Sequence, residues 1–376
     1  EKDAVHNVVQ GYERPLWFKT DLIRSEPPTW QRSQAHAAVA DECAAVRDSA
    51  GIIDISGAAK FEISGPEAAA FLDKLSSNKL PIKDGRMVLT LFHGPNGGIM
   101  TEQSITRINE QLFYLIGPIA SENRDLHWMQ QHSSDFNVKI DNCTDHLGGV
   151  LLTGPNSRAI LQQLTNSDLS AKAFPWLSCQ NVKIDSAQVR MLRVSYAGEL
   201  GFELHMPGYQ LVSLYQSLQR AGIGHGLRDF GGYAFNSLRM EKAYRAWGSE
   251  FTEEISGVEA GMERFIDTSR EFIGVSSIRQ RLAQTSSIRL AYLAFDDDIA
   301  CDCFGNEAIY YQGELVGLTT SGAYGHRVGY SLAFAYIKPE LITQDLGLQI
   351  MTSAGMRSAH VELDAAYDPT NEKLRS

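Results

Sequence analysis

A short segment that ends in Gly-Pro and leads into a helical pattern occurs twice in this chain, at Ile63-Ser-Gly-Pro66 and at Leu152-Thr-Gly-Pro155. Around each turn the order is the same: an apolar strand, the turn, a helix and then further strands. Proline suits the first turn of a helix, because its missing N–H would have no helical partner there. The repeated order therefore predicts two similar α+β units.

The pattern changes from about Ile288 onward, where helical periodicity disappears and short apolar segments alternate with turns. A chain of 376 residues is expected to build more than one hydrophobic core. Regularly spaced short strands of this kind predict a separate all-β barrel or sandwich. The expected strands are Leu290–Phe295, Glu307–Tyr311, Leu315–Thr320, Ser331–Ile337 and His360–Leu363.

Charge and composition exclude several classes of function. A net charge of −11 provides no basic field for nucleic acid. No run approaches the ~18 apolar residues that span a bilayer, so no membrane partner is expected. The five cysteines and the scattered histidines lack the spacing of a metal site, so no metal is predicted. Reduced thiols and the absence of a recognisable leader indicate the cytoplasm, or the mitochondrial matrix for a processed eukaryotic protein.

The sequence also lacks the usual motifs of nucleotide binding and of serine hydrolases. Gly222-Ile-Gly-His-Gly226 follows a helical stretch rather than a strand, so the end of a helix explains it better than a dinucleotide fingerprint. There is no Gly-Lys-Ser/Thr phosphate loop and no Gly-x-Ser-x-Gly elbow.

The segment Val194–Leu204 is predicted to form two strands joined by a tight turn, with Gly198 and Gly201 providing the turn geometry. In the second strand Phe202 and Leu204 share one face, so Glu203 lies on the other. A carboxylate held on a strand can accept two parallel N–H bonds from a planar edge such as that of a pterin or a guanidinium. The alternative is an ordinary solvated strand glutamate.

Glu102 follows a glycine-rich turn, Gly94-Pro-Asn-Gly-Gly98, and is expected to be delivered to a cleft at a strand end. Desolvation in such a cleft raises the pKa of a carboxyl group toward the working pH, where it can act as a base. A surface glutamate after a hairpin is the alternative interpretation.

Aromatic side chains supply the remaining candidates, and core packing is the alternative for each of them. Arg239, Glu241 and Arg245 are expected to share one helix, in which Glu241 and Arg245 form a structural pair four residues apart. The aromatic candidates for a ligand-binding wall are Tyr196, Phe174, Trp176, Tyr244, Trp247 and Tyr324.

Several segments, in the same order along nearly the whole chain, resemble the folate-binding aminomethyltransferase family of the glycine cleavage T-protein. The resemblance is greatest to the C-terminal, folate-binding half of dimethylglycine and sarcosine dehydrogenases. The segments are Gly11-Tyr-Glu-Arg-Pro-Leu-Trp-Phe18, Gly97-Gly98, Leu152-Thr-Gly-Pro-Asn-Ser-Arg158, Ala173-Phe-Pro-Trp176, Ser195-Tyr-Ala-Gly-Glu-Leu-Gly-Phe-Glu203, Ser237-Leu-Arg-Met-Glu-Lys-Ala-Tyr-Arg-Ala-Trp-Gly248, Val258-Glu-Ala-Gly261, Gly317-Leu-Thr-Thr-Ser-Gly-Ala-Tyr324 and Ser331-Leu-Ala-Phe-Ala-Tyr336.

This resemblance implies an α+β fold of three domains in a ring, two related α+β units and a C-terminal β-barrel, with tetrahydrofolate in a central funnel. The first unit would be discontinuous, and the second unit would be inserted into it. The implied boundaries are 1–54 with 143–250 for the first unit, including an irregular aromatic N-terminal arm, 55–142 for the second, 251–285 for a helical connection and 286–376 for the barrel.

The resemblance also implies roles for individual residues. Glu203 would hold the amino and N3–H groups of the pterin, and Tyr196 would line the pocket. Glu102 would assist proton removal as the one-carbon unit joins folate, and the alternative role for Glu102 is to position the folate. The chain departs from the family at three positions: many members have Asp where this chain has Glu102 and Tyr where it has Leu89, and T-proteins have Arg where it has Phe235. The lost arginine indicates that the glycine cleavage reaction itself is not the task of this protein.

The expected activity is tetrahydrofolate-dependent one-carbon transfer in the demethylation of a small methylated compound, with formaldehyde or an iminium captured as 5,10-methylene-tetrahydrofolate. A flavoprotein or another demethylating domain or subunit would deliver the activated carbon. The sequence is also compatible with two alternatives. One is direct methyl transfer from an onium or methyl ether donor to give 5-methyl-tetrahydrofolate, and the other is a non-catalytic regulatory or scaffold subunit with the same fold.

Overall fold

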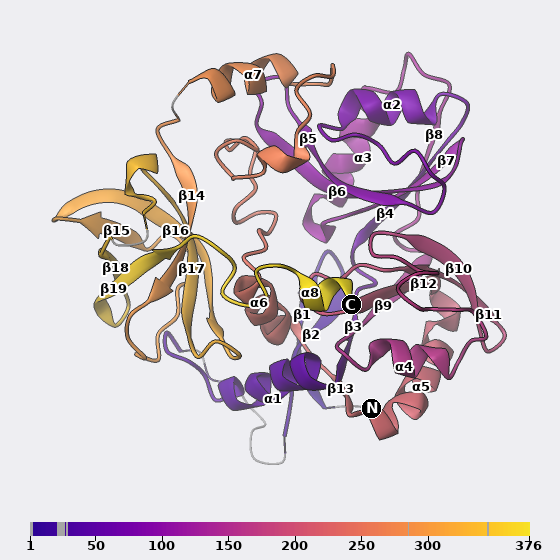
Figure 1. Cartoon of the computed structure of the whole chain (residues 1–376), viewed down its shortest axis with the longest axis horizontal. Coiled ribbons are helices and arrows are strands. Elements are labelled where there is room, and N and C mark those ends of the chain that lie inside the picture. The colour runs from indigo at the N-terminus through magenta and orange to yellow at the C-terminus, as the bar shows by residue number, and fades with distance from the viewer. Residues whose placement is uncertain (1–2, 21–26, 28, 285, 344–345) are drawn as a thin grey trace.

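The computed structural model describes residues 3–20, 27, 29–284, 286–343 and 346–376. Figure 1 shows three lobes, two of which contain a sheet with helices and the third of which is a barrel. Among the described residues, no helix is both long and apolar enough to cross a membrane.

The first lobe contains a six-stranded sheet in the order β10-β11-β12-β9-β3-β13. Its strands are β3 (Ala50–Asp54), β9 (Leu147–Thr153), β10 (Cys179–Ile184), β11 (Ala187–Leu192), β12 (Gly201–Pro207) and β13 (Leu227–Asp229). The helices of this part of the chain are α1 (Ala35–Asp48), α4 (Ser157–Gln162), α5 (Leu211–Gly222) and α6 (Gly232–Glu241).

The second lobe contains a five-stranded sheet in the order β5-β6-β7-β4-β8. All of its strands lie in the chain between β3 and β9 of the first sheet, and two helices accompany them. The elements are β4 (Ala59–Ser64), β5 (Met87–His93), β6 (Ile99–Asn109), β7 (Leu112–Gly117), β8 (Lys139–Asn142), α2 (Ala68–Leu75) and α3 (Glu122–Gln131).

The two sheets repeat the same topology, which confirms the prediction of two similar α+β units. In each sheet the strand before the Gly-Pro turn, β4 or β9, pairs with the last of three consecutive antiparallel strands. Gly65 and Gly154 occupy equivalent turns with φ of +131° and +117°. A Cβ at Gly154 would lie 2.7 Å from two backbone oxygens, so glycine is required there both by conformation and by space.

The third lobe is a closed barrel in the order β14-β17-β16-β15-β18-β19, which confirms the predicted C-terminal barrel. Its strands are β14 (Arg289–Phe295), β15 (Ala308–Tyr311), β16 (Glu314–Gly325), β17 (Tyr330–Ile337), β18 (Leu348–Thr352) and β19 (Gly355–Glu362). Helix α7 (Val275–Ala283) precedes the barrel, and α8 (Glu372–Arg375) follows it. The domain boundaries expected from the sequence stay a prediction.

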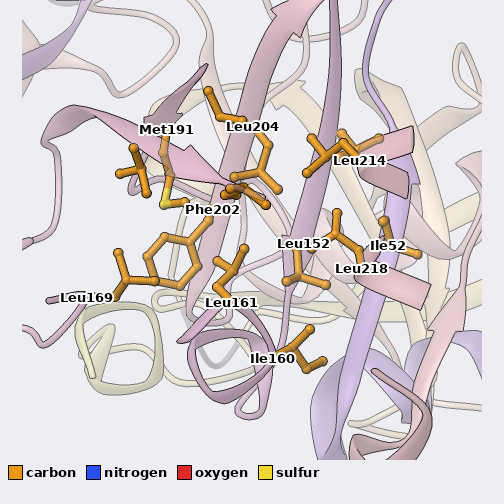
Figure 2. Close-up of a cluster of buried hydrophobic side chains, with 14 of the residues drawn as sticks. Ile52, Leu152, Ile160, Leu161, Leu169, Met191, Phe202, Leu204, Leu214 and Leu218 are labelled. Atoms are coloured by element: carbon orange, nitrogen blue, oxygen red, sulfur yellow. The ribbon is translucent and has the colours of Figure 1, made fainter. Parts of the chain in front are cut away.

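One face of the first sheet carries the main core of its lobe (Figure 2). Phe202 and Leu204 of β12 point into this core with Leu152 of β9, and α4 and α5 cover them. Because side chains alternate along a strand, Glu203 is directed to the opposite face, as predicted. The core of this lobe therefore fixes the direction of its candidate ligand-binding carboxylate.

Two expectations about local structure are wrong. The N-terminal arm is not irregular in its described part, because β1 (Ala4–Val9) and β2 (Tyr12–Phe18) form an antiparallel hairpin that buries Trp17 completely. Residues 21–26 and 28 of this arm lie outside the described residues. The segment Val194–Leu204 is not a tight hairpin either: β11 ends at Leu192 and β12 begins at Gly201, so residues 193–200 form a longer connection.

The two glycines expected to shape the turn, Gly198 and Gly201, meet different structural requirements. Gly198 has a φ of +82°, which confirms the expected special conformation. Gly201 is not among the residues with positive φ; instead, a Cβ at this position would lie 2.5 Å from Cβ of Ser195. The close approach of residues 193–200 to the start of β12 therefore requires a glycine there.

Candidate functional site

Glu102 lies on β6 opposite Leu91 of β5, on the sheet face that packs against residues 251–262. Its side chain is partly exposed, and burial nevertheless raises the pKa of its carboxyl group to about 7. Within the described part of the chain, no hydrogen bond or ion pair reaches this carboxyl group. A carboxyl group that is desolvated, partly accessible and without a partner is suited to act on a ligand.

The opposite face of β6 is fixed by a buried aspartate on α3. Oδ2 of Asp125 accepts hydrogen bonds from Thr101 Oγ1 at 2.8 Å and from Gln103 Nε2 at 2.9 Å. Burial raises the pKa of Asp125 to about 6. Since Thr101 and Gln103 flank Glu102, these bonds hold the strand so that Glu102 points away from α3.

Tyr196 lies in the 193–200 connection of the first lobe, within electrostatic reach of Glu102. Its hydroxyl donates a hydrogen bond to the backbone carbonyl of Arg245, and its ring centroid lies 5.5 Å from that of Phe235 and 5.6 Å from that of Tyr244. Burial raises the pKa of the Tyr196 phenol, and the nearby negative charge of Glu102 adds to this effect. Two predicted site residues from different lobes are thereby brought within electrostatic reach of each other.

Glu203 lies on β12 with its side chain 17% exposed. Oε2 of its carboxylate is 3.2 Å from Nε2 of His205, and Nδ1 of His205 is 2.8 Å from the hydroxyl of Tyr114 on β7. Among the described residues, the second carboxylate oxygen has no hydrogen-bond partner. Glu203 is therefore oriented through one oxygen and keeps the other available.

A buried lysine adds positive charge beside Glu203. Nζ of Lys60 donates to the carbonyls of Ser56 at 2.7 Å and Ala58 at 2.8 Å. Burial lowers the pKa of Lys60 to about 8, while the negative charge of Glu203 works in the opposite direction. The carboxylate of Glu203 is thus held at the junction of the two sheets in the field of a nearby cation.

The structure also brings Tyr244 and Trp247 to this region. Tyr244 is partly exposed beside Tyr196, as the ring distance above shows. Trp247 packs in the apolar cluster that contains Leu89 and Leu91, on the same sheet face as Glu102. The guanidinium carbon of Arg124 lies 4.2 Å from the centroid of the Trp247 ring.

Three predicted residues are not brought to these side chains. Phe174 is completely buried in the core of the first lobe, 5.8 Å from the ring of Phe202, on the sheet face opposite to Glu203. Trp176 lies beside the C-terminal helix, with the Arg375 guanidinium 5.0 Å from its ring. Tyr324 lies on β16 of the barrel and faces α1, where its ring centroid is 5.0 Å from that of His36.

Strand alternation predicts that His205 lies beside Glu203, on the same face, and the structure confirms this placement. The sequence did not predict that His205 and Tyr114 orient Glu203, because neither residue belongs to a motif. The expected pair between Glu241 and Arg245 does not form, because α6 ends at Glu241 and Ala243 has a φ of +52°. Glu241 instead pairs with Arg47 at 2.7 Å.

Models of two protein domains match this chain. The GCVT N-terminal domain matches residues 1–270, and the glycine cleavage T-protein C-terminal barrel domain matches residues 289–368. A solved structure, the glycine cleavage system aminomethyltransferase T from Bartonella henselae, superposes with a TM-score of 0.85. The superposition covers 98% of this chain and 95% of that chain at 18% sequence identity, and it shows a shared fold.

Two curated relatives illustrate the range of similar proteins. The mitochondrial dimethylglycine dehydrogenase of Rattus norvegicus is 36% identical over 346 residues, which cover 90% of this chain and 40% of that protein. The aminomethyltransferase of Thermoanaerobacter sp. (strain X514) is 33% identical over 251 residues, which cover 66% of this chain and 68% of that protein. This chain therefore spans less than half the length of the dehydrogenase.

Proposed function

This chain belongs to the family of the GCVT N-terminal domain and the glycine cleavage T-protein C-terminal barrel domain, and from this membership we propose a tetrahydrofolate-dependent one-carbon transferase that acts in demethylation. Aminomethyltransferases of this family bind tetrahydrofolate. The substrate would be a small methylated compound whose carbon arrives as formaldehyde or an iminium, and the product would be 5,10-methylene-tetrahydrofolate.

The observation that carries the proposal is the carboxyl group of Glu102, which is desolvated, partly exposed and close to the phenol of Tyr196. A protein seldom leaves such a group without a partner unless a ligand uses it. Its pKa of about 7 allows it to be ionised at neutral pH and to accept a proton readily. Glu102 is the residue to which we assign proton removal.

The residues present fit a reduced folate. The free oxygen of Glu203 and the oxygen shared with His205 can accept hydrogen bonds from the amino-substituted edge of a pterin. The partly exposed rings of Tyr196 and Tyr244 offer apolar faces, and Trp247 lies on the Glu102 side. When bound, tetrahydrofolate supplies the amine nitrogens that accept the one-carbon unit. The chain itself orients the ligand and removes the proton.

Delivery of the carbon requires a further component in this proposal. Oxidation of an N-methyl group removes two electrons, and a flavoprotein domain or subunit would accept them before the carbon reaches folate. The relative named dimethylglycine dehydrogenase is more than twice as long as the part that matches this chain. That difference in length supports a separate oxidising component.

The test begins with calorimetric titration of the protein with tetrahydrofolate. We expect binding, and we expect Glu203→Gln to weaken it roughly 10–100-fold, because a hydrogen bond to a charged group contributes about 1.5–3 kcal/mol. Glu110→Gln is the matched control, since the Glu110 side chain is 88% exposed on a β-hairpin turn. Its affinity should equal that of the wild type.

The outcomes separate the possible functions. Formation of 5,10-methylene-tetrahydrofolate from formaldehyde or an iminium supports the proposal, whereas 5-methyl-tetrahydrofolate from an onium or methyl ether donor would identify direct methyl transfer. Absence of folate binding at millimolar concentration would leave the regulatory or scaffold role. Unchanged affinity of Glu203→Gln would show that the pterin is held elsewhere.

A further inference from the structure

Arg245 is a partly buried cation to which no carboxylate of the described residues is paired. It follows the end of α6, and its Nε and Nη1 atoms donate to backbone carbonyls, Ala260 O at 3.3 Å and Ala243 O at 2.9 Å. Nη2 makes no hydrogen bond within the described part of the chain. Burial lowers the pKa of Arg245, and the positive charge of Arg264 adds to this effect.

Three other buried arginines of this protein form ion pairs with carboxylates. Arg47 contacts Glu241 at 2.7 Å, Arg239 contacts Glu250 at 3.2 Å, and Arg357 contacts Asp297 at 2.6 Å. Such pairing is the general rule, because an unpaired charge removed from water is costly. Arg245 departs from this rule, and so does Arg193, which donates to the backbone carbonyls of Phe174, Arg375 and Ser376.

The acidic groups near Arg245 are already engaged. Glu250 accepts hydrogen bonds from Arg239, the amide of Ala246 and the hydroxyl of Ser321. Glu263 forms an ion pair with Arg289 at 2.8 Å. Neither carboxylate forms an ion pair with the Arg245 guanidinium, so the described residues do not supply its counterion.

Arg245 lies next to the candidate site. The backbone carbonyl of Arg245 holds the hydroxyl of Tyr196, and the Arg245 charge acts on the phenols of Tyr196 and Tyr336. Gly261, with a φ of +68°, lies against Nη2, and a Cβ at that position would crowd it at 3.2 Å. A ligand bound beside Tyr196 would therefore lie within electrostatic reach of this guanidinium.

We propose that Arg245 is a carboxylate-recognition residue of the site, whose free Nη2 edge receives a carboxylate of a bound ligand. A planar guanidinium matches a carboxylate through parallel N–H bonds, which neither lysine nor an amide reproduces. The inference rests on the proposed function and adds to it a requirement for an acidic ligand. The carboxylate has two sources in that reaction, the glutamyl tail of the folate or an N-methylated amino acid that carries the carbon.

The test uses the full chain with Arg245→Gln, Arg245→Lys and a surface control, Arg228→Gln, whose side chain is 63% exposed. Calorimetry with tetrahydrofolate and with tetrahydropteroate, which lacks the glutamate, measures the contribution of the tail. Initial rates with formaldehyde premixed with sarcosine or with dimethylamine measure the contribution of a carboxylate on the carbon donor. Thermal unfolding verifies that each variant is folded.

A tail contact predicts that Arg245→Gln weakens tetrahydrofolate binding roughly 10–100-fold and leaves tetrahydropteroate unchanged. A donor contact predicts unchanged folate affinities and loss of the preference for the sarcosine mixture. In either case Arg245→Lys should lie between the wild type and Arg245→Gln, and Arg228→Gln should match the wild type. If folded Arg245→Gln matches the wild type in all these measurements, the assignment of Arg245 is wrong.

Titration with glutarate separates this inference from the proposed function. Binding of glutarate by the wild type and its loss in Arg245→Gln would support a carboxylate site even if tetrahydrofolate did not bind. Binding of tetrahydrofolate with no effect of Arg245→Gln on any ligand would leave the proposed function intact and overturn the inference alone.

Discussion

The carboxylate of Glu203 lies 3.2 Å from the imidazole of His205, two residues along the same strand, and the other ring nitrogen lies 2.8 Å from the hydroxyl of Tyr114 in the neighbouring sheet. Burial lowers the pKa of His205, so the ring is neutral at pH 7 and donates through only one nitrogen. If Tyr114 donates to Nδ1, then Nε2–H donates to Glu203. A tyrosine in one lobe thereby orients a candidate ligand-binding carboxylate in another.

The chain of hydrogen bonds from Tyr114 through His205 to Glu203 predicts an effect of His205→Leu. This variant should weaken tetrahydrofolate binding, while its rate at saturating folate stays near that of the wild type. The reason is that Glu203 loses the bond that orients it but keeps its charge. We expect a change of roughly 10-fold, equivalent to one hydrogen bond to a charged group. His205→Gln, which can still donate, should retain most of the affinity in the same titration. Equal losses in the two variants would indicate a general packing defect instead.

Glu102 should give the reaction a defined pH dependence. Its pKa is raised to about 7 by burial, and a base must be ionised to accept a proton. The rate of one-carbon transfer at saturating folate is therefore expected to rise with pH through about 7 and to level off above it. Glu102→Gln should be slower by roughly 100-fold or more and should lose this pH dependence. Retention of the inflection in Glu102→Gln would assign it to another group.

The same shift should appear in the stability of the protein. The carboxyl group of Glu102 ionises near its ordinary value of 4.5 when the chain is unfolded and at about 7 when it is folded. Between these values the folded state binds more protons, so stability falls as pH rises and the loss is complete above pH 7. Glu102→Gln lacks this loss. The unfolding free energy of Glu102→Gln, relative to that of the wild type, should increase by about 1–2 kcal/mol from pH 4 to pH 8. This is less than the free energy equivalent to the whole pKa shift, because Glu102 keeps contact with solvent.

Urea denaturation at the two pH values measures this difference directly. Glu42 and Asp125, whose pKa values burial also raises, titrate in both proteins and cancel in the comparison. A constant difference between wild type and variant across this range would show that Glu102 is solvated like a surface residue.

The arrangement of the sheets could be predicted from sequence because its signals are local. The two Gly-Pro turns lie at the ends of β4 and β9, and the spacing of short apolar segments identified four strands of the barrel and the end of β19. β18 was missed. The 193–200 connection was also mispredicted, because alternation at Val194 and Tyr196 continues a strand pattern after the pairing has ended. Strand pairing depends on partners distant in sequence, which periodicity does not reveal.

Individual site residues were harder to predict for a related reason. Phe174 and Tyr244 are both aromatic residues next to a motif, yet the first lies in the core and the second beside Tyr196. Sequence cannot distinguish them, because burial of an aromatic ring and stacking on a ligand require the same side chain. Arg245 was misassigned because the expected pair required α6 to continue past Glu241.

The placement of Phe174 gives a prediction that separates the two interpretations of that residue. Phe174→Leu should lower the unfolding free energy by about 1–2 kcal/mol, since a completely buried ring is replaced by a smaller side chain. Tetrahydrofolate affinity should remain within about 2-fold of the wild type, because the ring lies on the sheet face opposite to Glu203. Tyr244→Leu is the matched comparison and should show the reverse pattern. A large loss of affinity in Phe174→Leu, with little loss of stability, would restore its predicted role in the site.

Arg47 gives the final prediction, because its buried ion pairs support the connection that carries Tyr196. Its guanidinium contacts Glu199 at 3.1 Å and Glu241 at 2.7 Å, and it donates to the backbone carbonyl of Ala197 at 2.8 Å. Arg47→Gln would leave two buried carboxylates without their cation, so we expect a loss of about 3–5 kcal/mol in unfolding free energy.

Arg228→Gln is the control for Arg47, since its exposed pair with Asp41, at 3.8 Å, should contribute less than about 1 kcal/mol. Because Ala197 follows Tyr196 in the chain, Arg47→Gln should also weaken tetrahydrofolate binding at temperatures where the variant remains folded. Chemical denaturation and calorimetry on the same samples measure the two effects. If Arg47→Gln loses stability but keeps full affinity for tetrahydrofolate, the position of Tyr196 does not depend on these ion pairs. If Arg47→Gln and Arg228→Gln are equally stable, the buried pairs contribute no more than a surface pair.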